Sequence, residues 1–126
     1  MLVRERMTAP VITITPDHRF HDALHTMQEK NLHHLPVVDA QGALVGVVAE
    51  RDLLMAAVQY TTQGDVEVGD LMHREVVTVA TSTPIRDAAA EMLARRIGCL
   101  PVVDDGRVIG IITETDMLQA LVEMLD

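Results

Sequence analysis

Polar and apolar positions follow two different periods along this chain, and each period predicts one kind of element. Short runs rich in β-branched residues at 11–14 and 76–79 predict strands. Residues that recur at helical spacing predict two helices, with the positions Phe20, Ala23, Leu24, Met27 and Asn31 in the first and Ile85, Ala88, Ala89, Met92 and Leu93 in the second. Thr83 and Pro84 predict how the second helix begins, with threonine as N-cap and proline at the first helical position.

Each of these helices is followed by a predicted β-hairpin and then by a closing helix. The first hairpin is expected to join strands at 35–38 and 43–49, and the second to join strands at 100–103 and 107–113. The order of elements is therefore strand, helix, strand, strand, helix, and it occurs twice.

The closing helices carry more apolar residues than a small domain is expected to cover from one side. The first is expected over residues 52–58 and the second over residues 116–125. Exposed apolar surface of this extent usually marks an interaction site. We therefore expect a second copy of the chain to cover part of it, which would give a homodimer; the alternative is that these residues belong to a large core.

The two halves also share their sequence. The run Leu-Pro-Val-Val-Asp at 35–39 returns 65 residues later at 100–104. Gly-Val-Val-Ala-Glu-Arg-Asp at 46–52 returns as Gly-Ile-Ile-Thr-Glu-Thr-Asp at 110–116, a shift of 64 residues. The missing residue falls in the hairpin turn, where a change of loop length costs little. Two such copies are too few for a solenoid, and we expect the functional site to lie between them.

These boundaries divide the chain into three parts. The first repeat is expected over residues 7–60 and the second over 70–126, with a linker over 61–69. The polar stretch at 60–65 supports a linker at this point.

Composition excludes several classes of function. Of the 126 residues, 48% are apolar but only 2% are aromatic, so the core must be aliphatic. A net charge of −9 argues against general nucleic-acid binding, which needs a basic surface. Cys99 is the only cysteine, which excludes an internal disulfide and suits a reducing cytoplasm. No apolar run approaches the ~20 residues of a membrane span, and residues 1–7 lack the apolar core of a signal peptide.

The repeated motifs resemble the cystathionine β-synthase (CBS) domain family. The resemblance rests on Leu-Pro-Val-Val-Asp followed by Gly-x-x-Thr/Ala-Glu-x-Asp, and it extends from near Met7 to near Leu121. It implies an α+β, sandwich-like fold of two pseudo-symmetric β-α-β-β-α repeats packed sheet to sheet, in a pair that commonly dimerises. It also implies a regulatory module that binds AMP, ADP, ATP, S-adenosylmethionine, NAD or a similar adenosine ligand between the repeats. Ligand binding would then change the conformation and regulate an unidentified partner protein.

The resemblance and the residue chemistry together indicate ligand contacts near the ends of the second hairpin strands. Asp116 and Asp52 are candidate acceptors for ribose hydroxyls, although a carboxylate at a helix start also serves as a cap. Thr113 and the adjacent helix N-terminus are expected to receive phosphate. Ala49 lacks this hydroxyl in the first repeat, so we expect the cleft at Asp116 to be the better site. Arg51 is either a phosphate cation or an exposed surface arginine.

The remaining candidates come from the segments before the Leu-Pro motif and from the first strands. The resemblance makes His33 and His34 candidate phosphate contacts, and the alternative is that they are exposed loop histidines. The second copy has Gly98 and Cys99 there instead. Backbone groups of the first predicted strands are expected to read the adenine edge, at Val11, Ile12, Thr13, Val76, Val77 and Thr78.

Three alternative functions are an enzyme, a metal-binding protein and an interaction module without a ligand. An enzyme is not expected, because the chain lacks a Gly-rich phosphate loop, HExxH and GxSxG, and Cys99 is expected to be a buried thiol rather than a nucleophile. His18, His21 and His25 have helical spacing and could hold zinc or nickel, or they form a polar helix face. The third alternative is a dimerisation or protein-interaction module without a ligand. No cofactor other than an adenine nucleotide ligand is expected.

Overall fold

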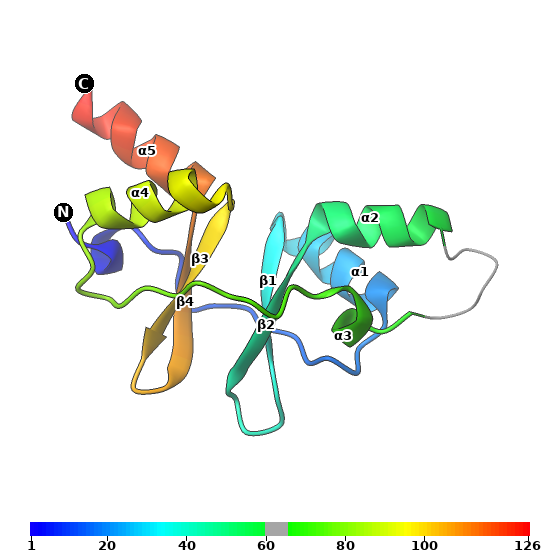
Figure 1. Cartoon of the computed structure of the whole chain (residues 1–126). Coiled ribbons are helices and arrows are strands. Elements are labelled where there is room, and N and C mark those ends of the chain that lie inside the picture. Colours follow the sequence, from blue (N-terminus) through cyan, green and yellow to red (C-terminus); the bar gives the residue numbers. More distant parts are fainter. Residues whose placement is uncertain (60–65) are drawn as a thin grey trace. The chain divides into compact units, whose positions relative to one another are not determined.

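The chain is divided between two compact units, each of which is described separately. The computed structural model describes residues 1–59 and 66–126, and the expected polar linker at 60–65 lies outside the described residues (Figure 1). Unit 1 combines Met1–Val11 with Val77–Asp126, and unit 2 is Ile12–Val76. The packing units therefore differ from the sequence repeats, because the segment that leads each repeat packs with the other repeat.

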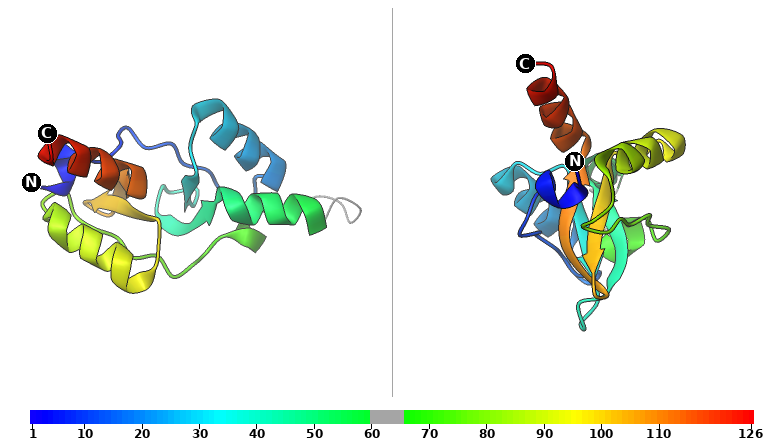
Figure 2. Two further views of the ribbon diagram at one scale, coloured as in Figure 1. Left: turned by 90° about the horizontal axis from the view of Figure 1, so that it is seen from above. Right: turned by 90° about the vertical axis from the view of Figure 1, so that its left-hand side faces the viewer.

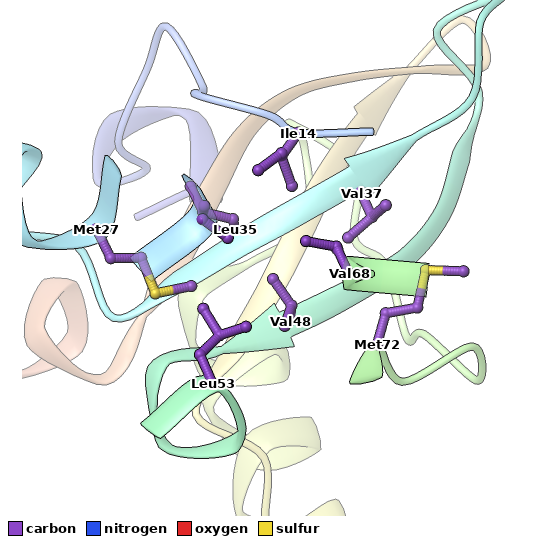
Figure 3. Close-up of a cluster of buried hydrophobic side chains, with 9 residues drawn as sticks. Ile14, Met27, Leu35, Val37, Val48, Leu53, Val68 and Met72 are labelled. Carbon is purple, nitrogen blue, oxygen red and sulfur yellow. The ribbon is translucent and has the colours of Figure 1, made fainter. Parts of the chain in front are cut away.

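Unit 2 is built from helices around a two-stranded antiparallel sheet. Its elements are α1 (Phe20–Lys30), β1 (His34–Val38), β2 (Leu44–Ala49), α2 (Glu50–Gln59) and the short helix α3 (Val68–Leu71). Side chains from all five elements converge in one aliphatic core (Figure 3), formed by Ile14, Ala23, Met27, Leu35, Val37, Val48, Leu53, Val68 and Met72. Val68 is fully buried, so the end of the expected linker belongs to the core of this unit.

Unit 1 repeats this plan. Its elements are the 3₁₀ turn η1 (Val3–Glu5), α4 (Ile85–Arg95), β3 (Cys99–Asp104), β4 (Arg107–Thr113) and α5 (Glu114–Met124). The N-terminal turn lies beside the two helices of the unit (Figure 2), and its Val3 joins a core with Ala88, Met92, Leu100, Val102 and Ile112. No helix in the described residues is long and apolar enough to cross a membrane.

The ends of the first helix of each repeat differ slightly from prediction. Asn31 and Arg96 have φ of 57° and 55°, in the left-handed conformation that ends a helix, so Asn31 caps α1 and lies outside it. The predicted cap at Thr83 is wrong, because Pro84 is the N-cap of α4. The Thr83 hydroxyl instead accepts the backbone N–H of Ala80 at 3.0 Å, which stabilises the preceding turn.

The two hairpin turns explain the one-residue difference between the repeats. In unit 1, Asp105 and Gly106 both have positive φ, 51° and 78°, as expected for a two-residue turn that matches strand twist. In unit 2 the turn is longer, and Asp39 Oδ1 accepts the backbone N–H groups of Gln41 and Ala43, both at 2.9 Å. Each sequence therefore closes its hairpin with a different turn chemistry.

The strands predicted at 11–14 and 76–79 do not form, and only single bridges join Ile14 to Val37 and Val79 to Val102. Val79 donates its N–H to the Pro101 carbonyl and accepts the N–H of Val103. In a parallel ladder the residue at 101 would donate to the carbonyl of Val77, but proline has no N–H. Pro36 interrupts the ladder in the same way at Ile12. The proline of the repeated motif therefore ends each ladder after one bridge.

Candidate functional site

The candidate residues of unit 1 converge on Asp116, the third residue of α5. Thr113 is the N-cap of this helix, and its hydroxyl accepts the Asp116 N–H at 3.3 Å. Asp116 Oδ2 in turn accepts the backbone N–H and the hydroxyl of Thr113, at 3.0 and 3.1 Å. This is a reciprocal capping box, which satisfies donors at the helix start. Asp116 is only 9% exposed, and the hydrogen bonds of the box hold its carboxylate in one position.

Thr8, which sequence reasoning missed, completes the Asp116 cluster. Its hydroxyl lies 3.2 and 3.3 Å from the two carboxylate oxygens. Backbone hydrogen bonds in both directions between Thr8 and Ile111 fix its position on β4. A carboxylate offers about four acceptor sites, and the described residues supply three donor groups to this one. About one acceptor site of Asp116 is therefore left for another group.

The equivalent carboxylate in unit 2 has different neighbours. Asp52 is also the third residue of its helix, α2, but Ala49 stands where Thr113 stands in unit 1. His73, also missed by sequence reasoning, has its Nε2 2.9 Å from Asp52 Oδ2. Backbone hydrogen bonds in both directions join His73 to Val47 on β2. His73 thus holds the position in unit 2 that Thr8 holds in unit 1.

The other polar candidates lie around the start of α2. His33 precedes β1, is exposed, and has its Nδ1 3.2 Å from Glu50 Oε1. His34 is the half-buried first residue of β1. Arg51 is exposed and lines a cavity of about 420 Å³, whose other lining residues among those described, Glu50, Leu54, Met55, Val58 and Gln59, also belong to α2. None of these contacts tests a role in binding phosphate, and that role stays a prediction.

The candidates for adenine recognition lie in extended segments that are not strands. Val77 and Thr78 line a cavity of about 760 Å³ in unit 1, opposite three charged residues of α4, Asp87, Glu91 and Arg95. Val76 ends unit 2 and Val11 ends the leading segment of unit 1, while Ile12 and Thr13 are exposed at the start of unit 2. The ladder interruption leaves the carbonyls of Ile12 and Val77 without their usual donor.

Cys99 is buried, whereas the two histidines of α1 are exposed. Cys99 is buried as expected, and burial together with the negative charge of Glu114 raises the pKa of its thiol to about 12. Such a thiol stays protonated at neutral pH, when only the thiolate is reactive. His25 Nε2 lies 3.2 Å from Glu29 and His21 Nε2 lies 3.7 Å from Asp22. Within residues 1–59 and 66–126, no group of three His, Cys, Asp or Glu residues is placed to hold a metal.

Known proteins similar to this chain agree on its fold. The model of the CBS domain matches residues 3–59 and 68–123. A CBS domain-containing protein of Dictyostelium discoideum is 32% identical over 137 aligned positions, which cover 100% of this chain and 94% of the relative. Other relatives are longer, and the chain spans 21% of an inosine-5′-monophosphate dehydrogenase of Methanocaldococcus jannaschii, to which it is 37% identical.

Two similar solved structures contain adenosine compounds. The CBS domain pair of protein MJ0100, in complex with 5′-methylthioadenosine and S-adenosyl-L-methionine, is 30% identical with a TM-score of 0.90, and 98% of each chain is covered. CBSX2 in complex with AMP is 36% identical with a TM-score of 0.82, covering 99% of this chain and 98% of CBSX2. The predicted α+β class is confirmed by these neighbours.

Proposed function

Because the chain belongs to the CBS domain family, we propose that it is a non-catalytic regulatory module that binds an adenosine-containing nucleotide at Asp116. The observation that carries the proposal is the cluster of Thr8, Thr113 and Asp116, in which two hydroxyls hold a buried carboxylate. Adenosine is the group shared by the ligands of MJ0100 and CBSX2. We therefore assign the remaining acceptor site of Asp116 to a ribose hydroxyl.

Each part of a nucleotide has a matching feature in the chain. A ribose hydroxyl would donate to Asp116, and the Thr8 hydroxyl can rotate to donate or accept beside it. At the N-terminus of α5 (Glu114–Met124), the N–H groups of Thr113, Glu114 and Asp116 already donate within unit 1. The Thr115 N–H would be the backbone donor for an anion such as phosphate. The adenine amino group would find an acceptor in the carbonyl of Val77, because Pro101 cannot donate to this carbonyl.

Regulation follows if a partner protein binds the liganded and unliganded forms unequally. A ligand shifts a conformational equilibrium only by its differential affinity for the two states. A cytoplasmic location, predicted from the lone cysteine, stays a prediction.

The test is thermal unfolding with AMP, ADP, ATP, S-adenosylmethionine, NAD and 2′-deoxy-AMP. A ligand at ~100 times its dissociation constant stabilises by ~2.7 kcal/mol, which is several degrees for a chain of this size. We expect Asp116→Ala to abolish the ligand-induced shift, while Asp104→Ala, at the exposed end of β3 (Cys99–Asp104), keeps it. The ligand-induced shift is compared within each variant, because Asp116→Ala also weakens the cap of α5.

The outcomes separate the two candidate functions. A shift from ribonucleotides that is weaker with 2′-deoxy-AMP supports ribose recognition by a carboxylate. No shift from any compound would contradict the proposal and favour a ligand-free interaction module.

We also propose that the chain forms a homodimer through α4 and α5. Leu118 and Val122 are 61% and 66% exposed, and an apolar groove of about 550 Å³ runs between the two helices, lined mainly by Leu, Ile and Met. The two walls of the groove carry similar types of apolar residue. The same patch on a second copy can therefore fill the groove, which would make an isologous interface. Light scattering at micromolar concentration should give twice 13.8 kDa.

A substitution within this face tests the interface. Leu118→Glu should give a monomer, because it places a charge in the apolar face. Gln119→Glu, at the neighbouring exposed position, should leave the dimer intact. A monomeric mass for the unmodified chain would contradict the dimer.

A further inference from the structure

Thr8 and His73 occupy equivalent positions in two units that otherwise repeat each other. Each follows a methionine that packs against a strand glycine, Met7 at Gly110 and Met72 at Gly46. Each forms an antiparallel bridge to the residue after that glycine. Each contacts the carboxylate at the third position of the following helix. The difference between the clusters therefore lies in the side chains and not in the backbone.

The chemistry around the two carboxylates is unequal. Asp116 is held by the hydroxyls of Thr8 and Thr113, which can each donate and accept and occupy little space. Asp52 faces an imidazole ring, whose Nε2 is 2.9 Å from Oδ2. Ala49 provides no hydroxyl, so the capping box that fixes Asp116 has no counterpart at Asp52. A ribose hydroxyl at Asp52 would meet the His73 ring beside Oδ2 and a carboxylate that no capping box holds in position.

We propose that His73 is a specificity-determining residue that, together with Ala49, closes the Asp52 cluster to ribose, so that one chain binds one nucleoside. This inference rests on the proposed function, because it takes ribose recognition by the Asp116 cluster as its reference. It gives the two clusters different roles, with ligand binding assigned to unit 1 and a side-chain contact between His73 and Asp52 to unit 2.

The inference is tested by building the unit 1 cluster in unit 2. Ala49→Thr with His73→Thr places two hydroxyls beside Asp52, in the arrangement found at Asp116. Isothermal titration with AMP should give one site per chain for the unmodified protein and two for this double variant. The second site should bind AMP at least about tenfold more tightly than the unmodified Asp52 cluster, since one hydrogen bond to a charged group changes affinity by about that factor.

Three further variants serve as controls for this experiment. His25→Thr replaces an exposed histidine of α1 and should leave one site per chain. Adding Asp116→Ala to the double variant should leave one site, now at Asp52. Thr8→His, the reverse exchange, should remove binding from the unmodified background, with circular dichroism used to verify that each variant is folded.

The outcomes distinguish this inference from the proposed function. Two equal sites in the unmodified chain, or one site in a folded double variant, would overturn the role of His73 and leave the role of Asp116 standing. Binding by the double variant alone would support the role of His73 and contradict the assignment of ligand to Asp116. No binding by either protein would overturn both.

Discussion

Replacing Gly110 by alanine tests whether the leading segment Met1–Val11 packs on β4 (Arg107–Thr113) as described. An added Cβ would lie 2.8 Å from Met7 Sδ and 3.1 Å from the carbonyl oxygen of Thr8. Ordinary contact between nonbonded atoms lies near 3.5–4.0 Å. The methionine can move aside, but the Thr8 carbonyl is backbone and is hydrogen-bonded to the Ile111 N–H at 3.1 Å. Relief therefore requires displacement of the leading segment itself.

We expect Gly110→Ala to lower the free energy of unfolding by about 1–3 kcal/mol, the usual cost of overpacking a close contact. For a chain of this length that corresponds to a decrease in Tm of roughly 4–12 °C. Thermal and urea unfolding of the full chain measure both quantities. The displaced segment would also draw Thr8 away from Asp116, so a weaker AMP-induced shift is expected in the same variant.

A second substitution identifies the contact responsible. Met7→Ala removes the atom at 2.8 Å but leaves the Thr8 carbonyl in place, so Met7→Ala with Gly110→Ala should cost less than the sum of the single changes. Strict additivity would show that the two residues are not in contact. An unchanged Tm for Gly110→Ala would refute the packing of this segment on β4.

Three further predictions concern separate features. Gly106→Ala should cost about 1 kcal/mol in urea unfolding despite having open space around it, because φ is +78°; no loss would contradict the turn. Thr113→Val should lower stability by about 1 kcal/mol through loss of the α5 cap, and an unchanged Tm would count against it. The raised pKa of Cys99 means that only the unfolded chain loses this proton above pH 9.0, so stability should fall as pH rises from 9.0 toward about 12. The decrease between pH 9.0 and pH 10 is about 1 kcal/mol, and urea unfolding of Cys99→Ala should lack it.

The elements with strong local signals could be predicted from the sequence. The helical spacing from Phe20 to Met27 and from Ile85 to Leu93 identified α1 and α4, and the repeated runs at 35–49 and 100–113 identified the two hairpins. The strand prediction at 76–79 was wrong, because a β-branched composition indicates only that these residues prefer an extended conformation. Ladder formation depends also on the partner strand, and Pro101 in that partner lacks the N–H that a second bridge needs.

Only those residues of the candidate site that lie close together in the sequence could be predicted. Thr113 and Asp116 are three residues apart, so a capping or binding pair was visible in the sequence. Thr8 lies 108 residues from Asp116, and nothing near Thr8 indicates a carboxylate partner. The repeat contains a signal that identifies both residues, because Thr8 follows Met7 and His73 follows Met72 at equivalent positions of the two copies. Extending the alignment upstream would also have paired Val3 with Val68, the buried residues of the two leading segments.

The crossed leading segments have a consequence for any fragment of this chain. Residues 1–11 complete the unit formed by 77–126, while residues 66–76 supply Val68 and Met72 to the unit formed by 12–59. A polypeptide with one repeat would lack the segment that completes its core. It could complete this core only by exchanging leading segments with a second molecule. Two fragments produced by a cut near residue 62 should therefore reassemble when mixed, because each fragment supplies the leading segment that completes the core of the other.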